Sequence, residues 1–339
     1  MKRTNIYILS MMVPLLLSSC SGKSVPSDPS TEEMRFRVGL MPFGDGTRSE
    51  YASAEIEDRI TSVSLFIYQD DRLICSDHYE TDFSEMTVEL TKGGTYDVYA
   101  LVNMGDMTGK MPDDKAANPI ENVEWNVPSF LYVKGNGLPM SGKAEGFIAG
   151  DGNQEIPLKR LFAKVSMMIG FGYEGASVTS VDVRNINGSL APFGVSAAKA
   201  SSSLLTEVTY DSETGTYVFY VPENMQGLIG TAEEPHEKNP DIDPDIASKK
   251  ELLTFVEIIA ALDGTGGYRG SVTYRSYLGN DDTGNFDIKG NCRYRWNMKC
   301  LEGGLSYNDW KTDTGSISSE FEQSVAADPY WDSEKDTEL

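Results

Sequence analysis

The sequence is poor in the residues that most enzymes use for catalysis. It has only two histidines, His78 and His236, among 339 residues. No serine or cysteine lies in a nucleophile elbow, so the pattern of a hydrolytic triad is missing. His236 stands among Glu233, Glu234 and Glu237, where a solvated loop histidine is the simplest interpretation. We therefore predict that the protein is not an enzyme.

Metal-binding patterns are also scarce. The chain has four cysteines, and none of their spacings resembles a zinc site. Asp241, Asp243 and Asp245 resemble the start of a calcium loop. However, Ile246 stands where the turn glycine belongs, and no bidentate glutamate follows at the required spacing. We expect neither a metal ion nor a cofactor.

Positive charge is in short supply. Lysine and arginine total 29 against 52 aspartates and glutamates, which gives a formal net charge of −23. Such a surface repels nucleic acid and anionic lipid headgroups, so we predict no nucleic-acid partner. With 40% hydrophobic and 24% charged residues, the composition is that of a globular protein.

The N-terminus carries a secretion signal. Two basic residues precede an apolar stretch, Ile6 to Leu17, which is too short to span a bilayer comfortably. It ends in Leu17-Ser18-Ser19-Cys20, the pattern at which bacterial lipoproteins are cleaved and acylated. We predict that residues 1–19 are a lipoprotein signal peptide and that acyl chains such as palmitate on Cys20 anchor the protein in the outer membrane. The alternative is an ordinary signal peptide with an incidental cysteine.

Three cysteines remain after Cys20, an odd number that cannot pair completely within one chain. Cys292 and Cys300 fall in one extended segment, whose eight residues span roughly 26 Å, too far for a disulfide. A disulfide that involves Cys75 stays open, with buried thiols as the alternative.

Alternating residues predict the first strand. Residues 20–33 are polar and flexible in composition, which indicates a tether. Met34, Phe36, Val38 and Leu40 then alternate with arginines and a glycine, which predicts a strand with one apolar face. Further strands are predicted at 60–68, buried on both faces, and at 87–90, 95–103, 155–171, 177–184, 206–210, 216–221, 253–262, 270–278 and 292–301. A short helix is the alternative at 253–262, and 197–205 is the best helix candidate.

Short strands separated by Gly, Asn, Asp and Pro turns predict an all-β fold of antiparallel sandwiches. The chain length suggests two domains. We place the boundary in the glycine-rich segment 170–175, which gives an N-terminal sandwich at 34–173 and a C-terminal sandwich at 174–311. Residues 312–339 then form an acidic tail or a donor segment.

Several runs, taken in order with the lipoprotein signal and Arg48, carry a resemblance over most of residues 17–311. They are LPMSG (138–142), LKRLFAKV (158–165), YVPENMQG (220–227), YRSYLG (274–279) and NFDI (285–288). In this order they resemble the fimbrillin proteins of the Bacteroidales. The resemblance implies two tandem transthyretin-like sandwiches, exported through the periplasm as a lipoprotein and polymerised with other subunits into type V fimbriae for cell adhesion.

The resemblance also implies a maturation step. A trypsin-like protease that cuts after Arg48 would release the lipid anchor together with the strand from Met34 to Leu40. The exposed groove would accept an extended segment of a neighbouring subunit. Two alternatives stay open. The first strand is a permanent edge strand, or the cut falls at Arg35, Arg37 or Arg59.

The donor segment is less well defined. Ile317, Phe321 and Val325 share one face of a strand, but the same spacing fits a helix stripe, and a loose acidic tail is a third interpretation. The protein is then a stalk or tip subunit of a fimbria, with an anchor subunit as the alternative. The alternative function is a monomeric outer-membrane surface lipoprotein that binds glycans through Trp125, Trp296 or Trp310.

Replacement of the lipidated residue tests the anchor. We expect Cys20→Ala to block lipid attachment and to mislocalise the precursor, because the acyl chains hold the protein on the membrane. Labelled fatty acid should enter the wild-type protein only. Incorporation into the mutant at the wild-type level contradicts the lipoprotein assignment.

Overall fold

The computed structural model describes residues 31–40, 54–83, 86–150, 153–172, 174–231, 233, 237–265 and 269–300. At residues 54, 55 and 321–328 it describes the backbone alone. Cys20, Arg48 and Ile317 lie outside the described residues.

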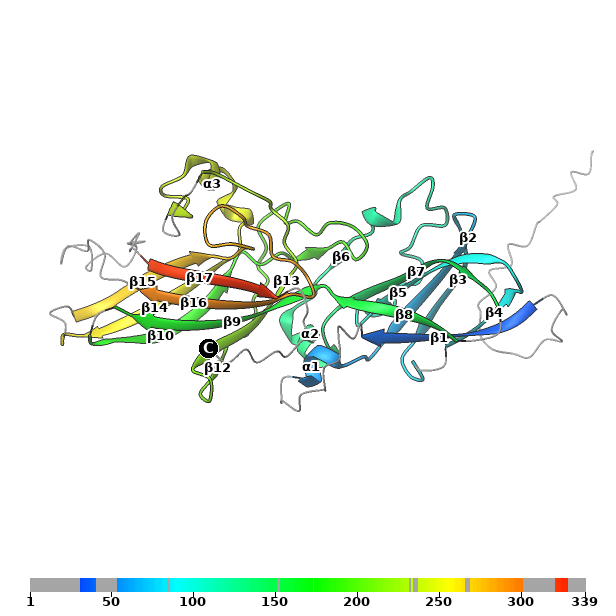
Figure 1. Cartoon of the computed structure of the whole chain (residues 1–339), viewed down its shortest axis with the longest axis horizontal. Coiled ribbons are helices and arrows are strands. Elements are labelled where there is room, and N and C mark those ends of the chain that lie inside the picture. Colours follow the sequence, from blue (N-terminus) through cyan, green and yellow to red (C-terminus); the bar gives the residue numbers. More distant parts are fainter. Residues whose placement is uncertain are drawn as a thin grey trace, which may run out of the picture.

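The N-terminal strands form one sheet of seven, in the order β3-β2-β5-β7-β8-β1-β4. This sheet occupies one end of an elongated molecule (Figure 1). Its strands are β1 (Thr31–Leu40), β2 (Val63–Gln69), β3 (Arg72–Tyr79), β4 (Met86–Thr91), β5 (Thr95–Val102), β7 (Met140–Ile148) and β8 (Asn153–Arg160).

The C-terminal strands form two sheets at the other end (Figure 1). The five-stranded sheet has the order β12 (Thr209–Asp211), β13 (Thr216–Pro222), β9 (Phe162–Phe171), β16 (Arg293–Cys300), β17 (Phe321–Asp328). The three-stranded sheet has the order β10 (Ala176–Arg184), β14 (Phe255–Asp263), β15 (Arg269–Tyr277). A small pair joins β6 (Trp125–Asn126) to β11 (Ser189–Leu190).

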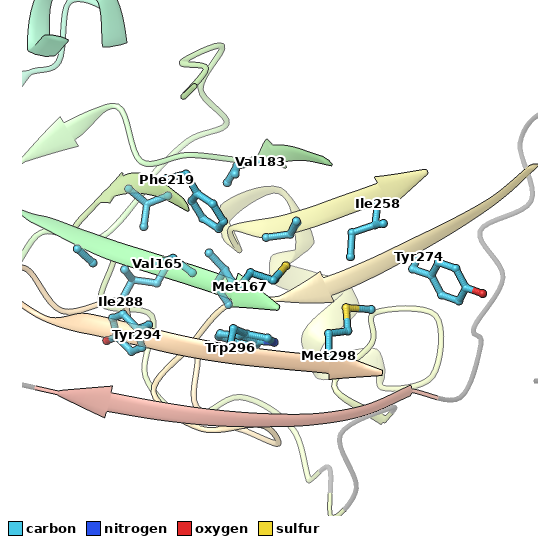
Figure 2. Close-up of a cluster of buried hydrophobic side chains, with 14 of the residues drawn as sticks. Val165, Met167, Val183, Phe219, Ile258, Tyr274, Ile288, Tyr294, Trp296 and Met298 are labelled. Carbon is cyan, nitrogen blue, oxygen red and sulfur yellow. The ribbon is translucent and has the colours of Figure 1, made fainter. Parts of the chain in front are cut away.

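Each end has its own hydrophobic core. In the C-terminal part, alternate residues of β9, β14 and β16 point into one cluster that contains Val165, Ile258 and Trp296 (Figure 2). In the N-terminal part, β1, β2, β4, β5 and β8 contribute to a second cluster. The period-two pattern of these strands therefore places one face of each sheet in a core.

A third cluster covers the outer face of β2 and β5. Phe66 and Tyr99 face away from the N-terminal core and pack under the segment that follows β5, together with Leu161 and Tyr220. The strand predicted at 60–68 corresponds to β2, and the prediction that it is buried on both faces is confirmed from Val63 to Tyr68. The cluster contains residues of both ends of the molecule.

The predicted all-β fold is confirmed, with two differences in strand direction. β1 pairs with β8 in parallel, and β9 pairs with β16 in parallel, whereas the other strand pairs are antiparallel. The sequence also did not predict β3 and β7. β3 follows β2 through a two-residue turn in which Asp70 and Asp71 both have positive φ, 49° and 64°. A tight hairpin turn of this kind needs positive φ at both positions.

The helix predicted at 197–205 is wrong. This segment has no helical turn; the Ala198 N–H donates to Asn224 Oδ1 (2.9 Å), and its carbonyl accepts from Gln226 (3.0 Å). Contacts with a distant segment replace the helical hydrogen bonds, and serine side chains compete for the backbone as well. The structure instead has short helices α1 (Ala54–Asp58), α2 (Phe130–Asn136) and α3 (Pro244–Lys249). The strand form predicted for 253–262 is confirmed by β14.

The predicted strand at 155–171 is two strands in different sheets. The chain leaves the seven-stranded sheet at the end of β8 and enters the five-stranded sheet at the start of β9, with Leu161 between them. The glycine-rich segment 170–175 joins β9 to β10. The division into domains at 34–173 and 174–311 stays a prediction.

The cysteines are buried in different cores. Cys75 lies in the N-terminal cluster, and Cys292 and Cys300 lie in the C-terminal cluster. Burial raises the pKa of the Cys300 thiol to about 12. This placement agrees with the buried-thiol alternative.

A fully buried asparagine ties three segments together at the end of β5. Asn103 has a left-handed backbone, with φ of 61°. Its side-chain amide donates to the carbonyls of Arg59 (2.7 Å) and Leu138 (2.8 Å), and its Oδ1 accepts from the N–H of Thr61 (2.9 Å). The residues that precede β2 and β7 are thus fixed by one side chain.

Replacement of this residue should destabilise the N-terminal sheet. We expect Asn103→Ala to lower the free energy of unfolding by about 2–4 kcal/mol, because buried groups lose their partners and alanine disfavours positive φ. Urea denaturation measures the loss. Asn185→Ala is the control: Asn185 also has positive φ (54°) but makes an exposed hydrogen bond to Lys250, so its loss should be smaller. Equal losses would contradict the role of the buried contacts.

Candidate functional site

Strand β1 lies inside the seven-stranded sheet. Residues 31–36 pair antiparallel with β4, and residues 35–40 pair parallel with β8. The prediction of an edge strand at this position is therefore wrong, because β1 has a neighbour on each side. The edge is β4, which follows β1 in the strand order.

The apolar face of β1 is the predicted one. Met34 and Phe36 are buried, and Val38 and Leu40 pack against the same core, while Arg35 and Arg37 on the other face are exposed. The Phe36 ring packs edge-to-face on Phe147, with centroids 5.6 Å apart. Each large apolar side chain that leaves water in this way contributes about 1.5–3 kcal/mol.

The inward register of β1 also includes a carboxylate that the sequence analysis missed. Glu32 is paired with the buried Leu90 of β4, two residues before Met34. Its Oε1 lies 3.4 Å from the Lys92 ammonium, whereas its Oε2 is buried without a hydrogen-bond partner among the described residues. Because Glu32 is polar, the alternation of apolar residues starts only at Met34, although the inward face of the strand starts at Glu32.

β4 depends on β1 for its place in the sheet. It is the end strand, and Met86, Val88 and Leu90 on its inner face are buried in the N-terminal core. Removal of β1 would leave β8 with an unpaired edge and would take away the ladder that holds β4. Any strand that replaces β1 must therefore restore two ladders as well as an apolar face.

Helix α1, downstream of β1, is fixed by separate contacts where β8 passes into β9. The Glu57 carboxylate accepts from Lys164 Nζ (2.7 Å) and from the Tyr220 hydroxyl (2.6 Å). The Glu57 carbonyl accepts from Arg160 Nε (3.0 Å), and Arg160 Nη2 lies 2.6 Å from Asp58. Burial, and next the Glu57 carboxylate, raise the pKa of Tyr220. The chain after residue 53 is thus held without the help of β1.

The C-terminal residues predicted as a donor segment form a strand of this chain's own sheet. Phe321 and Val325 lie in β17, at positions paired with Cys300 and Trp296 of β16. The strand form replaces the helix-stripe alternative at these residues. Oppositely charged residues stand at paired positions, Glu322 with Lys299 and Asp328 with Arg293, which favours this register.

The competing cleavage sites lie in ordered backbone. Arg35 and Arg37 are within the two ladders of β1. The Arg59 guanidinium donates to the carbonyls of Lys134 and Gly135, both at 3.2 Å. A protease needs extended, accessible backbone, so a cut at any of the three requires local unfolding first.

Two of the three tryptophans considered for glycan binding are buried. Trp125 and Trp296 are 7% and 1% exposed, respectively, and Trp310 lies outside the described residues. A flat binding platform needs exposed rings, so Trp125 and Trp296 cannot supply one.

Asp243, from the calcium-like segment, has a structural contact instead. It caps helix α3, with Oδ1 accepting from the N–H of Asp245 (2.8 Å), while Oδ2 accepts from the N–H of Thr231 (3.0 Å). In the described part of the chain, no three His, Cys, Asp or Glu side chains gather as a metal site would require. No helix in that part is both long and apolar enough to cross a membrane.

Comparisons with known proteins place this fold among fimbrial and adhesion proteins. Residues 219–298 match a family described as a domain of unknown function (DUF4906). No curated protein matches the chain.

Solved structures match over nearly the whole chain. A proposed cell adhesion protein from Bacteroides eggerthii is 15% identical, with a TM-score of 0.55, and the match covers 91% of this chain and 98% of that one. The tip fimbrial protein Mfa3 from Porphyromonas gingivalis, with a C-terminal truncation, is 13% identical, with a TM-score of 0.54 and coverage of 88% and 99%. A fimbrilin, FimA, from the same species is 13% identical, with a TM-score of 0.51 and coverage of 88% and 97%. The resemblance predicted from the sequence is confirmed as a likeness of fold.

Charges on the inner face of β1 should destabilise the uncleaved protein. We expect the double variant Phe36→Asp, Val38→Asp to lose at least about 3 kcal/mol of unfolding free energy, since two apolar side chains leave the core. Thermal unfolding of the full chain measures this loss.

The outer face of the same strand supplies the control. Arg35→Asp with Arg37→Asp makes two charge changes at exposed positions and should change stability by no more than about 1 kcal/mol. Protein that has lost β1 should not respond to the inner-face changes. A control loss as large as the inner-face loss would mean that the whole strand, rather than its buried face, is sensitive.

Proposed function

We propose that this protein is a structural subunit of a cell-surface fimbria, in a stalk or tip position. The observation that carries the proposal is the place of β1, an apolar strand with a ladder on each side, upstream of a helix that is anchored independently. The likeness of fold to fimbrial and cell adhesion proteins over 88–91% of the chain supports it.

The proposed route begins with export through the periplasm as an outer-membrane lipoprotein anchored at Cys20. A trypsin-like protease then cuts after Arg48, in the segment between β1 and α1. Because Glu57 and Asp58 bind Lys164 and Arg160, the new N-terminus would remain attached while β1 departs. A strand from a neighbouring subunit then fills the groove, with main-chain hydrogen bonds providing much of the attachment.

One feature distinguishes this proposal from a monomeric surface lipoprotein that binds glycans. Trp125 and Trp296, two of the three tryptophans that such a protein was expected to use, are buried.

A condition applies to the predicted donor residues. Donation by Ile317, Phe321 and Val325 would require β17 to leave β16 of its own chain.

The N-terminus of the protein in surface fibres tests the proposal. We expect subunits from sheared fibres to begin at Ser49 and to lack β1, as measured by N-terminal sequencing and intact mass. Arg48→Ala should leave β1 in place and reduce assembly, whereas Arg37→Ala, a matched arginine within β1, should be processed normally. Fibre subunits that begin at acylated Cys20, or that still contain Met34 to Leu40, would contradict strand removal.

A further inference from the structure

Glu32 is the residue of β1 with a buried side-chain oxygen that has no hydrogen-bond partner among the described residues. Among the side-chain atoms of the described residues that are buried without a hydrogen-bond partner, Glu32 Oε2 is the only carboxylate oxygen. The other oxygen accepts a hydrogen bond from the Lys92 ammonium (3.4 Å). The Glu32 side chain as a whole is 23% exposed, and that of Lys92 is 61% exposed. An exposed partner of this kind offsets little of the cost of burying a carboxylate.

The surroundings of Glu32 are those of an apolar residue. Its position continues the inward series of Met34 and Phe36, and its paired residue on β4, Leu90, is 3% exposed. β1 therefore faces the N-terminal core with four apolar residues and one carboxylate. At the position of Glu32, an apolar side chain would continue the alternation of the strand.

We propose that the strand that replaces β1 carries an apolar residue at the position of Glu32 and comes from a different protein. The inference rests on the proposed function and specifies the partner. β1 is a weaker occupant of its own groove than such a strand, so exchange is favourable. Glu32 keeps the precursor strand replaceable.

The sequence of the C-terminal region is a poor match to this groove. The groove takes five alternate inward residues, at positions 32, 34, 36, 38 and 40. On β17 the corresponding alternation is Phe321, Gln323, Val325 and Ala327, with a polar amide between the apolar residues. No run of five alternate apolar residues occurs anywhere after Cys300. A second copy of this chain therefore lacks the strand in that region.

The occupation of β17 supports the same conclusion. It forms the edge of the C-terminal sheet and pairs with β16 along all eight residues of the strand, from Cys300↔Phe321 to Arg293↔Asp328. A copy that donated this segment would leave one side of its own β16 without a strand, while β9 would still pair with the other side. The buried row of Tyr294, Trp296 and Met298 would then lose a neighbouring strand.

Peptide displacement tests the proposal in the full chain. A specific protease site inserted between residues 41 and 53 allows the protein to be nicked while β1 stays bound. Synthetic peptides are then added, and release of the β1 fragment is followed by size exclusion and mass spectrometry. The peptides are the native 31–40 sequence, its Glu32→Leu variant, its Glu33→Leu variant and the segment 317–328.

The matched control is Glu33, the neighbouring carboxylate on the exposed face of the same strand. We expect the Glu32→Leu peptide to displace β1 at about tenfold lower concentration than the native peptide, as removal of one buried carboxylate oxygen without a hydrogen-bond partner implies. The Glu33→Leu peptide should equal the native one. Segment 317–328 should need a concentration at least about tenfold higher than the native peptide, because its inward residues do not fill the groove.

Two results would overturn the inference. If Glu32→Leu and Glu33→Leu peptides act alike, the buried carboxylate does not weaken β1; if segment 317–328 matches the native peptide, a second copy is an adequate donor. Both leave strand replacement itself intact. Failure of all four peptides to displace β1 would contradict the proposed function as well, because β1 would then not be exchangeable.

Discussion

The N-terminal sheet depends on one strand with different neighbours along its two halves. The first half of β1 holds β4, and the second half extends the ladder from β8. Because β4 is the end strand and carries three buried residues, its packing against the core is coupled to β1. The loss of β1 therefore affects its two neighbours directly: β4 loses the strand it pairs with, and β8 loses one of its two neighbours. The pairings among β2, β3, β5 and β7 remain.

The two segments on either side of residues 41–53 are held by unlike forces. Backbone ladders and apolar side chains hold β1, with one carboxylate working against them. A buried ion pair between Lys164 and Glu57 and the Tyr220 hydroxyl hold α1, next to the passage from β8 to β9 (Figure 1). Removal of one partner of a buried ion pair leaves an uncompensated charge, so these contacts of α1 are costly to break and do not depend on β1. A chain cut between them is expected to lose the first and keep the second.

The sequence predicted strands with a clear period of two or with a mostly apolar run. β1, β14 and β16 alternate clearly. β2 is mostly apolar, as strands buried on both faces are. β7 begins with Met140, Ser141 and Gly142 and contains another glycine, which hides it. The segment 197–205 looked helical by composition, but the hydrogen bonds that decide its form come from residues 224–226.

The candidate site was predictable only where one segment carries the whole pattern. Met34, Phe36, Val38 and Leu40 could be assigned to one face without a structure. Glu57, Lys164 and Tyr220 come together from three segments far apart in the chain, and no local signal connects them. Glu32 was missed because a glutamate in an alternating series reads as the end of the strand.

The direction of β1 constrains how molecules of this kind can join. β1 runs parallel to β8 and antiparallel to β4, so a strand that keeps both ladders has one permitted orientation. If a strand of another protein replaces β1, as we propose, that protein must approach from one end of the sheet only. Such an interface is heterologous, because two different surfaces meet, and it cannot close on itself as a two-fold dimer does. A filament that contains this joint has a fixed polarity at that point, with chemically different subunits on its two sides.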